Sequence, residues 1–162
     1  MKRSSISRVG AISHVSCIDR RRLVSEAGGA VAGRPCRQLM DFGLARLENL
    51  CVLFGAQPVR VMARCGDATS EVFLELAGNL QIQYFGALGA SHDEQSLWVE
   101  GPRGSLRAAG AVLWWRKRGW PKFLPWGLQL RSQSNAGVGQ DSALREAILR
   151  SSAQGKVVEL AR

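Results

Sequence analysis

LMDFGLARLENLCVLFG, residues 39–55, has the residue pattern of an amphipathic helix. Asp41 suits the positive, N-terminal end of the helix dipole, and Gly55 suits the position just after the last turn. Pro58 lacks the N–H group that another helical turn would need, so the helix has to end before it. The apolar residues at helical spacing are Met40, Leu44, Leu47, Cys51 and Phe54. The pattern therefore predicts a helix over 39–55, followed by a strand.

Six segments around this helix alternate apolar and polar residues, as half-buried strands do. Ala77-Gly78-Asn79 separates two of them and is typical of a tight hairpin turn, because Gly and Asn tolerate positive φ. Strands joined by consecutive hairpins form a largely antiparallel sheet. The six segments are RVGAISHVSCID (8–19), PVRVMARC (58–65), EVFLEL (71–76), LQIQYFGA (80–87), LWVEG (97–101) and SLRAAGAVLWW (105–115).

The rest of the chain consists of connections and one closing unit. Residues 20–38 contain Gly28, Gly29, Gly33 and Pro35, which predict an irregular segment. Residues 132–140 have the composition of a linker, and 141–162 predict a helix followed by a short edge strand or tail. We therefore predict one α+β domain over 1–162: an open, largely antiparallel sheet of about six strands, with helices on one face. Its strand-rich core spans 8–131 and includes the helix over 39–55.

The second face of such a sheet would carry Phe73, Phe85 and Trp98. Large apolar side chains on an uncovered face usually mark a contact surface. The pattern predicts a homo-oligomer that pairs through the open sheet face, or docking of that face to another domain.

Composition favours a cytoplasmic protein without a metal site. The longest apolar runs are too short to cross a bilayer, and no apolar secretory segment follows the basic start of the chain. The four cysteines form no CxxC pair, and His14 and Cys17 are the only close pair among the cysteines and histidines. Cys17, Cys36, Cys51 and Cys65 are therefore predicted to be reduced thiols, and His14 and His92 to be a structural and an exposed histidine.

Five segments, in order, resemble the C-terminal domain of the glucose–fructose oxidoreductase/inositol dehydrogenase (Gfo/Idh/MocA) family. RVGAISHV resembles its entry strand, and LMDFGLARLENLCVLFGAQPVRVMA resembles its helix-then-strand signature, Asp-x-Gly-x-His-x-x-Asp. EVFLELAGNLQIQYFGA resembles its central hairpin, LWVEGPRGSLRA its Gly-x-x-Gly-Ser turn, and SALREAILRSSAQGKVVEL its closing helix and strand. The resemblance spans nearly the whole chain.

The resemblance implies a role in NAD(P)-dependent oxidation of a sugar or cyclitol. In that family an N-terminal Rossmann domain binds the cofactor, and the open sheet of the C-terminal domain commonly forms the dimer interface. The 162 residues contain no GxGxxG fingerprint, so we assign no cofactor-binding residues and expect no cofactor to bind this chain alone. We expect a truncated or stand-alone domain, whose activity would need a separate Rossmann-domain partner or a longer reading frame.

Within the helix signature, Asp41 and Gly43 match the family and Glu48 stands at its last acidic position. Asp41 is thus a candidate substrate contact, and Glu48 is a weaker candidate that a solvated helix surface would also explain. Ala45 occupies the position of the catalytic histidine and cannot accept a proton. Asp41 as a simple helix-start residue is the alternative, and we prefer it in the absence of a cofactor domain. Whether the chain is an enzyme stays open.

Two further function classes remain. The first is a non-enzymatic assembly module that uses the open sheet. The second is a basic single-stranded nucleic-acid binder, because the net charge is +9 and WWRKRGWPKFLPW mixes cations with aromatic rings. Residues 101–140 contain seven basic and no acidic side chains. We prefer the interpretation that Trp114, Trp115, Trp120 and Trp126 cover apolar surface while the cations face water, and nucleic acid is then an unlikely partner.

Overall fold

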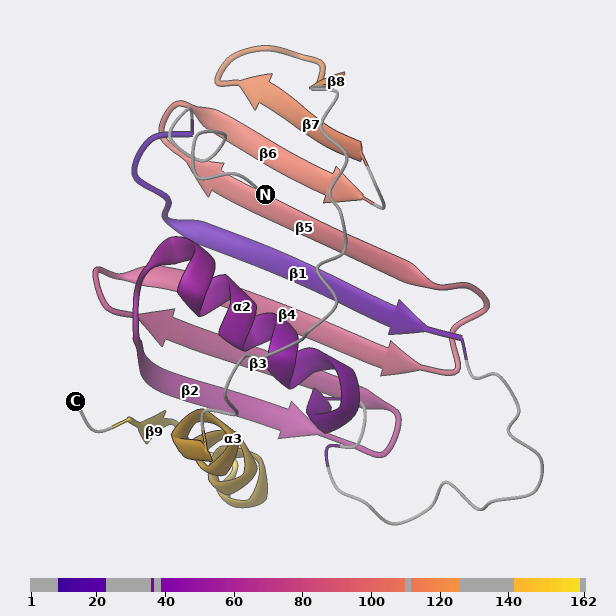
Figure 1. Ribbon diagram of the computed structural model, residues 1–162, viewed down its shortest axis with the longest axis vertical. Helices are drawn as coiled ribbons and strands as arrows, with labels where there is room; N and C mark the ends of the chain where they lie inside the picture. The colour runs from indigo at the N-terminus through magenta and orange to yellow at the C-terminus, as the bar shows by residue number, and fades with distance from the viewer. Residues whose placement is uncertain (1–8, 23–35, 37–38, 110–111, 126–141, 161–162) are drawn as a thin grey trace.

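The computed structural model describes residues 9–22, 36, 39–109, 112–125 and 142–160, except for the side chains of Asp41 and Phe42. The predicted linker over 132–140, most of the irregular segment over 20–38 and Trp126 lie outside these ranges. Within them, one mixed sheet of nine strands forms the body of the molecule, with the order β8-β7-β6-β5-β1-β4-β3-β2-β9 (Figure 1). The predicted α+β class with an open, mostly antiparallel sheet is confirmed.

The nine strands are the six predicted ones with three additions. The predicted strand over 105–115 is two strands, β6 and β7, and two-residue strands extend both edges. The short edge strand expected at the end of the chain is β9, whereas β8 is too short to show a periodicity and was not predicted. The bounds are β1 His14–Arg21, β2 Pro58–Cys65, β3 Thr69–Leu76, β4 Leu80–Leu88, β5 Glu94–Gly101, β6 Gly104–Ala109, β7 Val112–Lys117, β8 Leu124–Pro125 and β9 Val158–Glu159.

Strand β1 takes part in the one parallel pairing of the described sheet. It lies between β4, with which it is parallel, and β5, with which it is antiparallel. Hairpin signals identify only pairs of neighbouring segments, so they could not place the first strand in the middle of the sheet. This insertion brings the C-terminal ends of β1 and β4 to one edge of the sheet (Figure 1).

The helix predicted over 39–55 is observed in two parts. Leu39–Gly43 forms a π-helical turn, η1, and Leu44–Phe54 forms the α-helix α2. Gly55 follows α2 in the left-handed conformation with φ 64°, as predicted. Asp41 lies in η1 and so precedes the first turn of α2, whose first turn contains no acidic residue.

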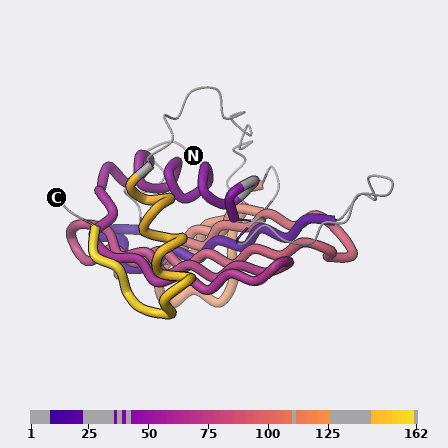
Figure 2. The backbone as a smooth tube through the Cα atoms, turned by 90° about the horizontal axis from the view of Figure 1, so that it is seen from below, coloured from indigo at the N-terminus to yellow at the C-terminus, as the bar shows by residue number. Residues whose placement is uncertain are grey.

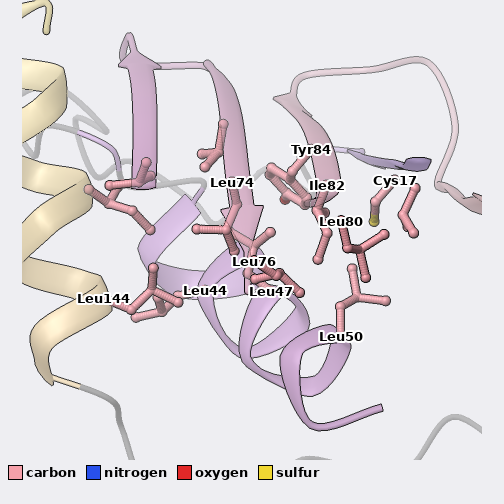
Figure 3. Packing of buried hydrophobic residues seen from close by; sticks show 14 of the residues in the cluster. Cys17, Leu44, Leu47, Leu50, Leu74, Leu76, Leu80, Ile82, Tyr84 and Leu144 are labelled. Atoms are coloured by element: carbon pink, nitrogen blue, oxygen red, sulfur yellow. The ribbon is translucent and has the colours of Figure 1, made fainter. Parts of the chain in front are cut away.

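Helix α2 lies across one face of the sheet and closes the core (Figures 1 and 2). Leu44, Leu47 and Leu50 of α2 point toward the strands, where they meet buried residues of β3 and β4 (Figure 3). Burying a leucine side chain contributes roughly 1.5–3 kcal/mol, so this stripe holds the layer together. The largest fully buried strand residues are Leu74, Leu76, Ile82, Tyr84, Leu106 and Leu113.

The second helix, α3 (Ser142–Gln154), packs against β2 and β9 at the margin of the sheet (Figures 1 and 2). Its hydroxyls accept hydrogen bonds from the edge of β2: Ser151 Oγ from Ala63 N–H at 2.9 Å, and Ser152 Oγ from Cys65 N–H at 3.2 Å. Farther along β2, strand β9 pairs with Arg60 and Val61. The β2 edge is therefore covered along its length, which protects it from pairing with other chains.

The face opposite α2 carries alternating charged and aromatic side chains. Phe73 of β3 is 47% exposed, and the Arg20 guanidinium lies 5.9 Å from the centroid of the Phe85 ring. The register places Met62, Phe73 and Gln83 in one row across this face, with Trp98 farther along the same line. Among the described residues, no helix is long and apolar enough to span a membrane.

Candidate functional site

Several polar side chains from different elements meet at the end of the sheet where β1 ends. The hairpin loop between β4 and β5 reaches it, because Ala90 N–H donates to Arg21 O at 3.2 Å and Arg22 N–H to Asp93 Oδ1 at 2.7 Å. Helix α2 reaches it through Arg46, whose Nη2 lies 3.5 Å from Ser96 O. We call Asp19, Arg21, Arg46 and Gln95, with the η1 turn above them, the β1-end site.

Asp19 is the buried charge of the β1-end site. Its side chain is 1% exposed and accepts a hydrogen bond from Arg21 Nε at 2.8 Å. The Gln95 carboxamide lies against the other side of the Arg21 guanidinium, where its oxygen accepts from Nη1 at 3.2 Å once the amide is oriented toward it. A buried carboxylate needs such a partner, and Arg21 in turn is 31% exposed. Arg21 is therefore held by the buried Asp19 and the exposed Gln95, while part of its own side chain faces solvent.

Cys17 lies one step inward from Asp19 on the same face of β1 and is fully buried. Burial raises the pKa of its thiol to about 11; the nearby Arg46 opposes this shift, and Asp19 adds to it. The thiol is therefore protonated at neutral pH and cannot act as a thiolate nucleophile. Its role here is apolar packing beneath Arg46.

The η1 turn places Asp41 above this layer. Gly43, two residues later, has no side chain, and a Cβ there would lie 2.6 Å from both Leu39 Cδ1 and Tyr84 Oη. The close approach of η1 to Tyr84 thus depends on glycine at this position. Ala45 follows at i+4 from Asp41 and is half-buried. Ala45 has no titratable side chain. Asp41 therefore has no neighbour at position 45 that could accept the proton released when an alcohol is oxidised.

Glu48 is a correction to the sequence analysis. A solvated helix surface was the expected alternative to a site role, but Glu48 is 6% exposed and faces the core side of α2. It has an interaction partner within the fold. The helical stripe of α2 is wide enough to bury this position beside Leu44 and Leu47, which the residue type alone did not indicate.

The remaining candidate residues are dispersed. His14 begins β1 opposite Gln81 and Glu100, and His92 is exposed, with Nδ1 3.0 Å from Ser91 Oγ. All four cysteines are free, and the described residues contain no group of three or more potential metal ligands. Of the tryptophans, Trp115 packs partly against the core while Trp120 is 48% exposed.

Sequence reasoning missed Asp19, Arg21, Arg46 and Gln95. One signal for Asp19 was present. It continues the inward-facing alternation of Val15 and Cys17, so the pattern placed a charged residue on the buried face of β1. Charges are rarely buried without a partner, which would have drawn attention to Arg21 at i+2. Arg46 and Gln95 carried no such signal, because they meet β1 only through the tertiary fold.

The fold has known counterparts, although no protein-family model matches the sequence and a search of curated proteins finds no match. An oxidoreductase domain protein from Kribbella flavida matches 98% of this chain with a TM-score of 0.73 at 13% identity. An aldose–aldose oxidoreductase from Caulobacter crescentus, complexed with glycerol, matches 97% with a TM-score of 0.71 at 17% identity. Levoglucosan dehydrogenase in complex with NADH and levoglucosan matches 98% with a TM-score of 0.73 at 10% identity.

This chain spans only 62%, 58% and 61% of those three proteins. The match therefore covers the C-terminal domain of Gfo/Idh/MocA-type oxidoreductases and leaves their N-terminal part without a counterpart. At these identities the likeness shows the fold, and it confirms the resemblance drawn from the five sequence segments.

Proposed function

We propose that this chain is the substrate-binding and pairing domain of an NAD(P)-dependent oxidoreductase that acts on a sugar-like or cyclitol-like substrate. The observation that carries the proposal is the match of 98% of the chain to 61% of a dehydrogenase whose structure holds NADH and levoglucosan. In this proposal the cofactor is held by a Rossmann domain outside the 162 residues, and the chain alone binds neither NAD nor NADP. A cytoplasmic setting agrees with four free cysteines, since thiols stay reduced there.

The β1-end site supplies the chemistry of polyol binding. Hydroxyl groups are recognised by charged donors and acceptors that are already fixed in place. Arg21 is such a donor, because Asp19 and Gln95 hold its guanidinium. Asp41 in η1 is the acceptor that we assign to a substrate hydroxyl. With Ala45 in place of the histidine, this domain binds substrate without supplying the base for hydride transfer.

Binding experiments test the proposal directly. Glycerol, glucose, myo-inositol and levoglucosan would be titrated into the purified full chain by saturation-transfer NMR, with NADH and NADPH in separate experiments. We expect a ring polyol to bind with a Kd of ~1 mM, and neither cofactor to bind. Asp41→Ala and Arg21→Gln should each weaken polyol binding about tenfold. Arg64→Gln is the matched control, because Arg64 is an exposed arginine of β2.

Two results would contradict the proposal. Micromolar binding of NADH to the chain alone would show that a cofactor site exists within these residues. Equal polyol affinity for wild type, Asp41→Ala and Arg21→Gln would remove the β1-end site from substrate recognition.

A second candidate function is that of a non-enzymatic assembly module. The observation that favours it is the line of Met62, Phe73 and Trp98 across the open sheet face, which we call the aromatic row and in which Phe73 is 47% exposed. This function needs no catalytic residue, so it is compatible with Ala45. Polyol binding would support the first function, with or without an assembly role for the sheet face, and self-association without polyol binding would support the second.

A further inference from the structure

Four cations of the basic segment, Arg103, Arg116, Lys117 and Arg118, lie at the end of the sheet opposite to the β1-end site. The turn after β5 and the turn after β7 lie side by side there, because Arg118 N–H donates to Arg103 O at 3.0 Å. Arg116 and Lys117 end β7 next to these turns (Figure 1). Within the described ranges, none of these four basic side chains pairs with a carboxylate. The charge here is thus uncompensated and favours an anion.

A cavity of about 420 Å³ opens between these turns. We call it the β5–β7 pocket; the lining residues used here are Glu100, Gly104, Ser105, Arg116, Arg118 and Trp120. Glycine is required at position 104, since a Cβ there would collide with the backbone of Arg116. Gly119 adopts φ 82°, which turns the chain so that Arg118 and Trp120 both border the pocket.

The pocket combines a fixed cation with an exposed aromatic ring. The Arg116 guanidinium lies 4.7 Å from the centroid of Phe123 and 6.0 Å from that of Trp98, so two rings hold it. The Trp120 ring is supported by Trp115 at a centroid distance of 6.3 Å, yet Trp120 remains 48% exposed. A supported but exposed ring is a stacking surface for a planar group.

One carboxylate also lines the pocket. Glu100 accepts a hydrogen bond from Trp98 Nε1 at 2.8 Å, which fixes it beside Ser105 across the β5–β6 pair. It repels a bare anion but accepts hydrogen bonds from hydroxyl groups. The residues that line the pocket therefore include two arginines, a carboxylate that can accept from hydroxyl groups, and an exposed tryptophan.

We propose that the β5–β7 pocket binds a nucleotide unit. Arg116 and Arg118 bind its phosphate, Glu100 and Ser105 its ribose hydroxyls, and Trp120 stacks on its base. The site goes beyond the proposed function, because Glu100 pairs with His14 at the start of β1 while the β1-end site lies at its other end. The unit can be a free mononucleotide or part of a single-stranded nucleic acid.

Titration of the full chain with AMP, monitored by tryptophan fluorescence and calorimetry at low salt, tests the site. Adenosine and inorganic phosphate probe the two halves of the ligand, and we expect each to bind at least about tenfold more weakly than AMP. Arg118→Gln and Trp120→Ala should each weaken AMP binding about tenfold. Lys122→Gln is the matched control, because Lys122 lies in the same turn, exposed and outside the pocket lining.

Titration with a short oligoadenylate distinguishes a free mononucleotide from a single-stranded nucleic acid as the ligand. If the affinity rises with oligonucleotide length and falls steeply with salt, the ligand is a single-stranded nucleic acid. Equal affinity for AMP and the oligonucleotide indicates a mononucleotide ligand. The proposal is overturned if AMP does not bind, or if Lys122→Gln weakens it as much as Arg118→Gln, which would indicate general charge attraction. Polyol binding at the β1-end site does not enter this test, so the two proposals fail separately.

Discussion

The absence of a side chain at Gly43 allows the conformation of the η1 turn. Gly43 lets η1 approach Tyr84, a fully buried residue of β4, and so sets the height of Asp41 above the sheet. Any Cβ here would lie 2.6 Å from two atoms that are themselves packed in the core. Packing at this one residue thus links the conformation of the candidate site to the stability of the fold.

Gly43→Ala should therefore lower the free energy of unfolding by about 1–3 kcal/mol, as overpacking of a filled core does. Urea unfolding followed by tryptophan fluorescence measures the change. Gly66→Ala is the control, because a Cβ at Gly66 meets no atom closer than 3.7 Å. Equal stability of the two variants would show that η1 relaxes without cost.

The buried Cys17 predicts a pH dependence in the alkaline range. Burial raises the pKa of its thiol from 9.0 to about 11, so between these values the unfolded chain loses a proton that the folded chain keeps. The unfolding free energy should thus fall as pH rises from about 9 to about 11. In Cys17→Ala this fall should be shallower, and a measurement at pH 7 separates the loss of packing. Parallel curves for wild type and variant would contradict the assignment.

At the scale of the element, the edge of β2 is completed by a helix. Ser151 is fully buried; its Oγ accepts from Ala63 N–H at 2.9 Å and donates to Lys156 O at 2.6 Å. The Ser151 hydroxyl thereby joins the end of α3 to Lys156, just before β9, and accepts a hydrogen bond from the edge of β2. Ser152 repeats the arrangement at Cys65 N–H and also lies 3.7 Å from Cys36 Sγ.

Ser151→Ala should cost about 1–3 kcal/mol of stability, because it leaves the Ala63 N–H buried without an acceptor. Hydrogen exchange of the Ala63 amide is the local measurement, and we expect it to accelerate relative to amides of β4. Gln154→Ala, an exposed change in the same helix, is the control. Unchanged exchange at Ala63 in Ser151→Ala would mean that water replaces the hydroxyl.

Across the whole molecule, one face of the sheet is closed by α2 and the other is open (Figure 2). On the open face, salt bridges such as Arg20–Glu94 at 3.1 Å and Arg60–Glu75 at 3.6 Å alternate with aromatic side chains. Exposed pairs of this kind add little stability, so they serve solubility or specificity of contact rather than folding. The aromatic row is the part of the face whose burial would stabilise an assembly.

We expect the chain to self-associate through this face, and Phe73→Asp to weaken association at least about tenfold. Sedimentation velocity across micromolar concentrations measures it. Val52→Asp is the matched control, since Val52 is 66% exposed on α2, on the covered side of the sheet. A wild-type chain that is monomeric throughout would contradict the interface, and so would equal association of both variants.

Local sequence pattern was sufficient for most elements. The stripe of α2, the left-handed Gly55, and the turn at Gly78 and Asn79, both with positive φ, depend on neighbours within a few residues. The same locality explains the errors. The two-residue strand β8 is too short to show a pattern, and the burial of Glu48 follows from packing against the sheet, which the helix sequence alone does not reveal.

The candidate site divides in the same way. The sequence by itself was enough to select Asp41 and Gly43 as candidates and to show that Ala45 replaces the histidine, because the helix signature is contiguous. Only the tertiary structure joined Arg21 to Asp19 and Gln95, and Arg46 to the β5 backbone, since β1 lies between strands that follow it in the chain by more than sixty residues. Contacts between distant segments depend on sheet order and register, and hydrophobic periodicity specifies neither.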